Sequence, residues 1–385
     1  MFIYIKNGIV YAPDYQGKKD ILICMDKIVS VYENGSFQIE KISNKIHIID
    51  AKNMIILPGF IDQHMHFLGG GGKFGYAYRA GIVKFDDIIK FGITTAISSL
   101  GVDSYLKSLS DLLIRAKELE ARGLNTYILT GGFQLPLKSI TNSIFDDLIY
   151  IEKVLGVGEI GIADEYGSQP TAEEIIRIVA NTRAVSSFSE KPGKVLIHLG
   201  SGKKGFEVIY KVLENADLLI DQFIVTHINR STELLEEAIK FAKLGGIIDI
   251  TTGISPELGI EDSIPPEDAL EYILAQSVSF DHITFSSDSG GFRSIYDNNL
   301  KINDYLLSSE TLFKTISKCF QEKEVELSKV LKTVTSNVAR IWNLKNKGEI
   351  KPYRDADLVL LDQDFKVKKV ICLGKIIFDS DRDKN

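Results

Sequence analysis

The pattern of hydrophobic and polar positions divides the chain into three stretches. Over residues 1–57, apolar and polar positions alternate in short runs such as FIYIKNGIVY, DILICMDKIVSVY and KIHIIDA. A period of two is typical of strands, so this stretch predicts a small antiparallel sheet. Over residues 58–345, strand-like runs such as GITTAISS and KVLIHLG alternate with helical segments such as YLKSLSDLLIRAKELEARG. Repeated βα units of this length predict a parallel sheet with helices packed against it.

Residues 346–385 form the third stretch and return to strand-like runs, in KGEIKPYRDADLVLLD and VKKVICLGKIIF. We expect them to pair with residues 1–57, so that both termini build one small β-sandwich domain. For residues 58–345, a closed TIM (β/α)8 barrel is favoured over an open sheet. Polar residues suited to chemistry stand at the carboxyl ends of many separate strands, as they do on one face of a barrel, and not at a single switch point.

The composition favours small-molecule chemistry over a nucleic-acid or membrane partner. The 385 residues are 44% hydrophobic, and their formal net charge of -7 provides no basic surface for a phosphate backbone. Apolar stretches such as residues 54–61 are too short to cross a bilayer, and the first residues lack the apolar core of an export signal. Three widely spaced cysteines without CxxC spacing fit a reducing compartment. We therefore expect a cytoplasmic protein.

Two of the six histidines stand together in PGFIDQHMHFLGGGG. His64 and His66 follow the apolar run MIIL, and residues two apart on a strand point to the same side. Both imidazoles can therefore reach one ion. The glycines at 69–72 let the backbone turn away sharply and leave space above the strand end.

Three further polar residues end strand-like runs. His198 closes KVLIH, His227 closes FIVTH and Asp288 closes HITFSSD. Because strand ends of a barrel open on one face, we expect these side chains and the HxH pair to converge on one metal site. Imidazole and carboxylate ligands suit zinc, with iron, manganese or cobalt as alternatives. A single histidine on an apolar strand is more often structural, and we assign that role to His47 and His282.

At these residues the sequence resembles the amidohydrolase superfamily, and within it the isoaspartyl (β-aspartyl) dipeptidases. The resemblance runs nearly end to end. It rests on LPGFIDQHMHFLGGGG, GITTAISSLG, ILTGGFQLP, VLIHLGSGKKG, VTHINR, GGIIDITT, TFSSD, SNVARIWNL and KGEIKPYRDADLVLLD. It implies a distorted TIM barrel with a binuclear metal site, a β-sandwich made from both termini, hydrolysis of an amide bond, and assembly into a homo-oligomer.

The resemblance also implies a role for each expected ligand. His64 and His66 would hold the more buried of two divalent ions, most simply Zn²⁺, and His198 and His227 the more exposed one. Asp288 would ligate the first ion and move protons. Two such ions would supply a water whose pKa is lowered toward neutrality. Asp288 would take a proton from this water and deliver it to the leaving nitrogen.

The expected bridging ligand departs from the usual pattern of the family. Most members use a lysine carboxylated by CO₂, whereas the segment VGEIGIADE offers Glu159 at the matching position and no lysine. Because a glutamate carboxylate can bridge two ions as a carbamate does, we expect Glu159 to be the bridge. An unpaired carboxylate in this apolar segment would be costly, which favours a ligand role. If the alignment with the family is displaced along the chain, Asp164 or Glu165 would instead be the functional carboxylate.

The substrate-binding positions match the dipeptidases less well. Arg230 matches an arginine that holds a substrate carboxylate, as suits a planar guanidinium. Lys73 stands where the dipeptidases place a glutamate for the α-ammonium group of the substrate, although a solvated loop lysine is nearly as good an interpretation. Phe133 replaces a tyrosine, Tyr166 falls near a second arginine, and Phe292 falls where a serine follows the catalytic aspartate. The pocket is therefore expected to be rebuilt.

Three functions remain open from the sequence. The first is a β-aspartyl dipeptidase-like enzyme with an altered pocket. The second is an amidohydrolase that acts on a cyclic amide or an N-acylated acidic amino acid, which Lys73 and Arg230 together would favour. The third is a metal-binding barrel without catalysis. Asp288 argues against the third, because a purely structural site is expected to be coordinatively closed.

Overall fold

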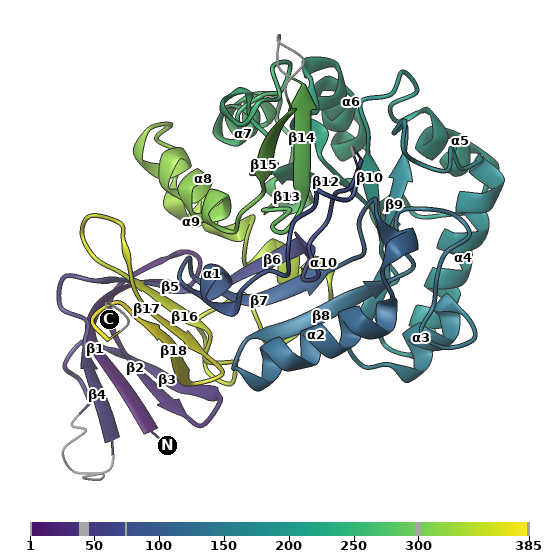
Figure 1. Ribbon diagram of the computed structural model, residues 1–385. Coiled ribbons are helices and arrows are strands. Elements are labelled where there is room, and N and C mark those ends of the chain that lie inside the picture. Colours follow the sequence, from purple (N-terminus) through teal and green to yellow (C-terminus); the bar gives the residue numbers. More distant parts are fainter. Residues whose placement is uncertain (1, 38–45, 74, 297–301, 383–385) are drawn as a thin grey trace.

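The computed structural model describes residues 2–37, 46–73, 75–296 and 302–382, and of residues 292–296 and 302–305 it describes the backbone only. The chain forms a βα barrel and a smaller β-lobe to which both ends of the chain belong (Figure 1). The predicted α/β architecture, a TIM barrel with a β-sandwich built from both termini, is confirmed. None of the helices in the described part is both long and apolar enough to cross a membrane.

Eight parallel strands form the barrel, and each pairs with the next along the chain. They are β6 (Phe60–Met65), β7 (Ile93–Ser98), β8 (Asn125–Thr130), β9 (Val154–Ile162), β10 (Val195–Leu199), β11 (Phe223–Thr226), β12 (Ile247–Thr251) and β13 (Ile283–Ser286). The first and last strands meet where the backbone N–H of His66 donates to the carbonyl of Ser289 at 2.8 Å. The N–H of Asp288 likewise donates to the carbonyl of His64 at 3.0 Å. The segments that close the barrel therefore carry three of the expected metal ligands.

Most helices pack around the outside of the barrel (Figure 1). The α-helices are α1 (Phe85–Ile89), α2 (Leu109–Ala121), α3 (Ile144–Tyr150), α4 (Ala172–Phe188), α5 (Glu207–Asn215), α6 (Thr232–Lys243), α7 (Pro266–Ala275), α8 (Glu310–Gln321), α9 (Leu327–Lys332) and α10 (Ser336–Ile341). Thr171 and Glu174 form a capping box that starts α4. Leu234, Ala238 and Phe241 are buried on one face of α6, because their spacing of four and three residues matches the helical period.

Apolar packing fills one end of the barrel. Trp342 is fully buried there with Ile61, Leu155 and Leu196, which lie toward the amino ends of their strands. The indole N–H of Trp342 donates to Oε1 of Gln63 at 2.8 Å. Because this end is filled, the carboxyl end of the strands is the one available for a functional site.

The β-lobe is one eight-stranded sheet. Its strands are β1 (Phe2–Tyr11), β2 (Tyr15–Cys24), β3 (Lys27–Glu33), β4 (Ile46–Asp50), β5 (Ile55–Pro58), β16 (Leu358–Leu361), β17 (Val367–Cys372) and β18 (Lys375–Asp379). β5 pairs antiparallel with β16, with Pro58 opposite Leu358, and so joins the two ends of the chain. Ile3 and Ile5, two residues apart on β1, contribute to a separate buried core of this lobe, and Val10 joins that core beyond an irregularity in the strand.

The expectation of a purely antiparallel sheet over residues 1–57 is wrong in part. β1 pairs antiparallel with β2, but β4 and β5 run parallel to β1. Parallel neighbours need a crossover connection instead of a tight turn, and β2 and β3 lie within that crossover. A period of two identifies strands but does not determine their direction. The domain boundaries at 57/58 and 345/346 stay a prediction, which limited proteolysis would test.

Candidate metal centre

The expected ligands come together at the carboxyl end of the barrel. His64 lies near the end of β6, and His66 follows that strand. Glu159 lies within β9 and His198 within β10, while His227 directly follows β11. All five side chains are buried. Because the strands are parallel, their carboxyl ends share one face, which brings these side chains around a common point.

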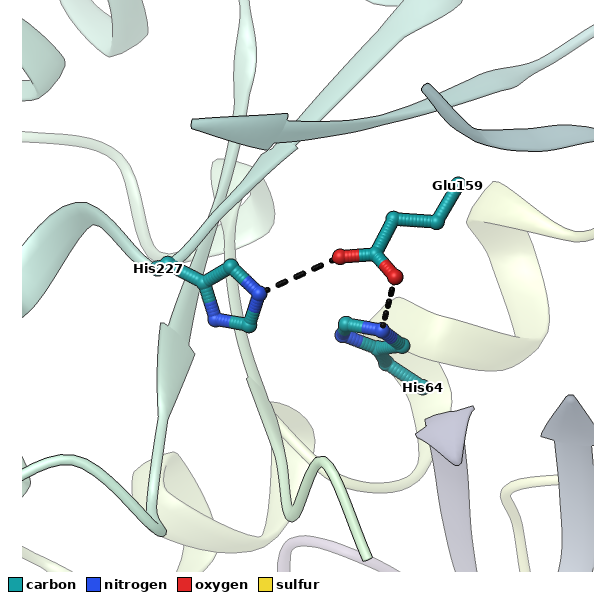
Figure 2. A group of neighbouring side chains, drawn as sticks. All are labelled: His64, Glu159 and His227. Carbon is teal, nitrogen blue, oxygen red and sulfur yellow. Dashed lines mark hydrogen bonds and ion pairs between the residues drawn. The ribbon is translucent and has the colours of Figure 1, made fainter. Parts of the chain in front are cut away.

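The carboxylate of Glu159 lies at the centre of this group. Its Oε2 is 3.2 Å from Nε2 of His64 and 3.6 Å from Nε2 of His66. Its Oε1 is 2.5 Å from Nδ1 of His198 and 3.2 Å from Nε2 of His227. Figure 2 shows the two oxygens turned toward His64 and His227 on different sides. Each oxygen thus faces its own pair of imidazoles, which is the arrangement that a bridging ligand requires.

Asp288 lies beside the HxH pair. Its Oδ1 is 2.9 Å from Nε2 of His66 and 3.8 Å from Nε2 of His64. Two groups of three residues bring their ligand atoms within 4.8 Å of one another: His64, Glu159 and His227, and His64, His66 and Asp288. His47, in β4, and His282, in the turn before β13, belong to neither group.

Two members of the cluster have a left-handed backbone. His227 has a φ of 68° and Asp288 a φ of 54°. A residue other than glycine rarely adopts this conformation, at a cost of about 1–3 kcal/mol, and such residues cluster at functional sites. The two strained positions coincide with the side chains that the sequence assigns to the metal.

Contacts outside the cluster orient its imidazoles. Nδ1 of His66 lies 3.1 Å from the carbonyl oxygen of Ser99, and Nδ1 of His227 lies 2.7 Å from Oγ1 of Thr251, so that Nε2 of each ring faces inward. His64 is completely buried, yet neither of its ring nitrogens forms a hydrogen bond with the described residues. Buried imidazoles normally find a partner. An imidazole nitrogen that faces carboxylates without forming a hydrogen bond to them fits a ligand of a divalent metal ion.

The electrostatics of the cluster favour a cation. Burial alone would lower the pKa of His64, but the carboxylates of Glu159 and Asp288 outweigh it and raise that pKa to about 9. Burial would likewise raise the pKa of both carboxyl groups, but the imidazoles, with His64 foremost, hold each below its usual range. Burial and the guanidinium of Arg230 lower the pKa of His227. Ionised carboxylates among buried imidazoles suit a divalent ion, which would replace the proton on His64.

A cleft of about 300 Å³ opens above the cluster. Four of the expected substrate-binding residues line it, namely Lys73, Phe133, Tyr166 and Arg230. The side chain of Phe292, the fifth, lies outside the described part of the structure. The backbone of Phe292 begins β14 (Phe292–Tyr296), which pairs with β15 (Ile302–Leu306) after the last barrel strand.

Lys73 turns toward the cleft. Its Nζ lies 4.2 Å from the centre of the Tyr166 ring and 3.8 Å from Oδ1 of Asp164. A cation over an aromatic face is attracted by the ring quadrupole, and the nearby carboxylate adds to this attraction. The contacts therefore favour a pocket residue over a freely solvated loop lysine.

Arg230 and Phe133 flank the same histidine. Nη2 of Arg230 lies 3.3 Å from Nε2 of His198. The ring of Phe133 is buried and packs edge-on against His198, with ring centres 4.7 Å apart. Lys73 and Arg230 therefore give the cleft a cationic wall, and Phe133 adds an apolar ring that has no hydroxyl group.

Glu159, Asp164 and Glu165 were the three acidic residues that the sequence left open at this site, and the structure places them at different points. Glu159 lies at the centre of the cluster. Asp164 instead contacts the outer nitrogen of His198, with Oδ2 3.2 Å from Nε2, and Glu165 is exposed at the cleft. Sequence reasoning did not predict the contact of Asp164. The one signal for it was the position of Asp164, two residues beyond β9 on the face that carries the ligands.

Comparisons with known proteins agree with this geometry. The sequence pattern of the Amidohydrolase family matches residues 55–377. The crystal structure of β-aspartyl dipeptidase from Fervidobacterium islandicum AW-1, in complex with β-Asp-Leu dipeptide, has 38% sequence identity and a TM-score of 0.91, and the match covers 100% of this chain and 99% of that one. Dihydroorotase from Clostridium acetobutylicum is 25% identical, over 94% of this chain and 90% of its own length. An enamidase structure at 18% identity and a TM-score of 0.67 shares the fold.

The chain therefore belongs to the amidohydrolase family. Family membership, the fold and the buried group of imidazoles and carboxylates define a metal-dependent hydrolase, as predicted. The similarity to a β-aspartyl dipeptidase confirms the resemblance seen in the sequence. The alternative of a metal-binding barrel without catalysis is not supported.

Proposed function

We propose that the protein hydrolyses the β-aspartyl amide bond of small dipeptides with a water activated at a two-metal centre. The observation that carries this proposal is the placement of Glu159, whose two carboxylate oxygens face separate pairs of imidazoles. The structure with 38% identity, which contains β-Asp-Leu dipeptide, supports the choice of substrate.

The proposed ligands divide between two ions, most simply Zn²⁺, with iron, manganese or cobalt as alternatives. His64, His66 and Asp288 would hold the more buried ion, and His198 and His227 the more exposed one. Glu159 would bridge the two. When bound, such a pair of ions supplies a water of lowered pKa and polarises the carbonyl group of the substrate.

Asp288 provides the proton transfer. Its pKa lies below the usual range despite burial, because His64 and His66 stabilise the carboxylate. The group is therefore ionised at neutral pH and can accept a proton from the attacking water. It then donates this proton to the leaving nitrogen, which departs as an amine.

Arg230 provides the anchor for a substrate carboxylate. Its guanidinium lines the cleft beside His198, and Nε is buried without a hydrogen-bond partner among the described residues. A planar guanidinium binds a carboxylate through two parallel hydrogen bonds. The carboxylate of the departing amino acid would therefore bind next to the more exposed ion.

Lys73 supports a second candidate substrate class. Its ammonium group faces the cleft over Tyr166, where it would repel the free α-ammonium group of a β-aspartyl dipeptide. A cation there favours a substrate with an extra carboxylate or without a free amine. N-acylated or cyclised acidic amino acids meet this condition.

The test is a substrate panel on the Zn²⁺-loaded protein. β-Asp-Leu, α-Asp-Leu, N-acetyl-β-Asp-Leu and a cyclised acidic amino acid differ in linkage and in charge at the amine. We expect leucine release from β-linked but not α-linked dipeptide, its loss after chelation and its return with metal. Faster cleavage of the N-acetyl or cyclic compound would favour the second class. If the metal-loaded protein hydrolyses none of these compounds, both candidate substrate classes are contradicted.

We also propose that the protein works in the cytoplasm as a homo-oligomer on a small-molecule substrate. Cys24, Cys319 and Cys372 are all free thiols, which supports a reducing compartment. The oligomer is an expectation from the resemblance to the dipeptidases. Light scattering coupled to size exclusion tests it, and the mass of a single chain would contradict it.

A further inference from the structure

Asp164 is held firmly beside the metal cluster. Its Oδ1 accepts a hydrogen bond from the N–H of Tyr166 at 2.9 Å. Its main-chain carbonyl accepts from the N–H of Gly167 at 2.9 Å and from the side-chain amide of Gln169 at 2.5 Å. Only 5% of the residue is exposed. The carboxylate therefore has a fixed direction.

The chain that follows His198 packs directly against this acidic residue. A Cβ atom at Gly200 would lie 2.6 Å from Cβ of Asp164, and one at Gly202 would lie 2.4 Å from the carbonyl oxygen of Ala163. The N–H of Gly202 donates to that same carbonyl at 2.7 Å. The two loops are therefore fixed relative to each other, and only glycine fits at their closest approach.

The ring of His198 is held from both sides. Oδ2 of Asp164 lies 3.2 Å from Nε2, and Oε1 of Glu159 lies 2.5 Å from Nδ1. Nη2 of Arg230 also lies 3.3 Å from Nε2, but when Nε2 carries a proton it can donate only to the carboxylate of Asp164. His198 differs in this from His66 and His227, whose Nε2 atoms face the cluster. A carboxylate that accepts a hydrogen bond from the outer nitrogen of a metal-binding histidine fixes the ring and makes the inner nitrogen more basic.

We propose that Asp164 is a positioning residue that keeps Nδ1 of His198 directed at the more exposed metal ion. Asp164 also lies near both pocket cations, since Lys73 Nζ is 3.8 Å from Oδ1 and Arg230 Nη1 is 4.0 Å from Oδ2. These separations are too long for hydrogen bonds, but opposite charges at such distances attract. One carboxylate therefore connects metal binding to the cationic wall of the cleft.

The inference rests on the proposed two-metal function and is tested by metal affinity rather than by activity. Metal-free full-length protein is titrated with Co²⁺ or Zn²⁺ against a chromophoric chelator, and the visible spectrum of the Co²⁺ form reports the ligand geometry. The variants are Asp164→Ala, which removes the acceptor, and Asp164→Asn, which keeps an oxygen that can accept from Nε2–H. Asp20→Asn is the matched control, because Asp20 is a buried carboxyl bonded to Tyr4 in the β-lobe.

We expect Asp164→Ala to weaken the second metal equivalent by about 10- to 100-fold and to change its Co²⁺ spectrum, while the first equivalent stays unchanged. Asp164→Asn should recover most of the affinity, and Asp20→Asn should match the wild type. The inference would be overturned, and the proposed function left standing, by either of two results. One is that Asp164→Ala binds both metal equivalents with wild-type affinity. The other is that the Ala and Asn variants lose the same amount of affinity. A wild-type protein that binds fewer than two equivalents would contradict the proposed function and this inference with it.

Discussion

Oε2 of Glu159 lies 3.2 Å from Nε2 of His64, and both side chains are removed from solvent (Figure 2). An anion beside an imidazole with no hydrogen bond creates a strong local preference for a cation. Because the other oxygen of Glu159 faces His198 and His227, this carboxylate is the one described group that contacts all four histidines of the cluster. We therefore expect the negative charge of Glu159 to contribute to the binding of both proposed ions.

Glu159→Gln tests this role. The amide keeps the shape of the side chain but loses the negative charge and one metal-binding oxygen, so we expect bound metal to fall from about two ions toward one. Turnover should fall roughly 100-fold or more, since a single ion cannot both activate water and polarise the carbonyl in the same way. Elemental analysis of metal-loaded protein measures the first effect. Glu236→Gln, at an exposed position on α6, is the control. Unchanged metal content would remove Glu159 from the site.

Asp288→Asn tests proton transfer. Asparagine cannot accept a proton at neutral pH, so kcat should fall by about 100- to 10,000-fold while KM changes little. The variant should be assayed at saturating metal, because Asp288 is also a proposed ligand of the buried ion. A kcat within tenfold of the wild type, at full metal occupancy, would show that another group moves the proton.

Lys73→Glu tests substrate recognition by reversing one charge. A glutamate at this position would attract the α-ammonium group of β-Asp-Leu, so we expect kcat/KM for this dipeptide to rise about tenfold, the value of one additional charge-assisted hydrogen bond. For N-acetyl-β-Asp-Leu we expect kcat/KM to fall. Parallel changes for the two substrates would mean that Lys73 affects the loop and not recognition.

Lys347 provides a stability test away from the site. Its Nζ lies 2.8 Å from Oδ2 of both Asp355 and Asp357, and only 5% of the side chain is exposed. Lys347→Met would leave the carboxylate of Asp357 without its cation and that of Asp355 with Lys27 alone. We expect the free energy of unfolding in urea at pH 7 to fall by about 3–5 kcal/mol. Lys345→Met, at an exposed lysine, should change it by less than about 0.5 kcal/mol.

The pH dependence of this effect follows from the sign of the shifts. Burial would lower the pKa of Lys347, but Asp357 and Asp355 outweigh it and raise it above 10.5, so its contribution is complete below pH 10.5 and is lost as pH rises through the folded-state pKa. Burial would raise the pKa of Asp355, but Lys347 lowers it below 3.8, so its contribution is present above pH 3.8 and is lost in stronger acid. The difference between wild type and variant should therefore shrink below pH 3.8. A constant difference there would contradict the pairing.

The barrel and most of its proposed ligands could be predicted from the sequence because both depend on local pattern. Histidines such as His198 and His227 end apolar runs, and parallel strands bring such ends to one face whatever the loops do. Glu159 was identifiable from its position within an apolar strand and from the match to the family. These predictions require only that the strands are located correctly in the sequence.

Other features depend on contacts between segments that the local pattern does not contain. The direction of β4 and β5 relative to β1 follows from how the chain crosses the lobe, so the antiparallel expectation was wrong there. The contact of Asp164 with His198 depends on the close approach of two loops at Gly200. The placement of Lys73 over Tyr166 likewise joins two loops that are far apart in sequence.

The most direct test of the central claim is a metal titration of the metal-free protein with β-Asp-Leu hydrolysis followed in the same samples. We predict two equivalents bound per chain, with full turnover reached only at the second equivalent, because Glu159 is placed to join two ions. Full turnover at one equivalent, or turnover that survives complete chelation, would contradict a two-metal hydrolase.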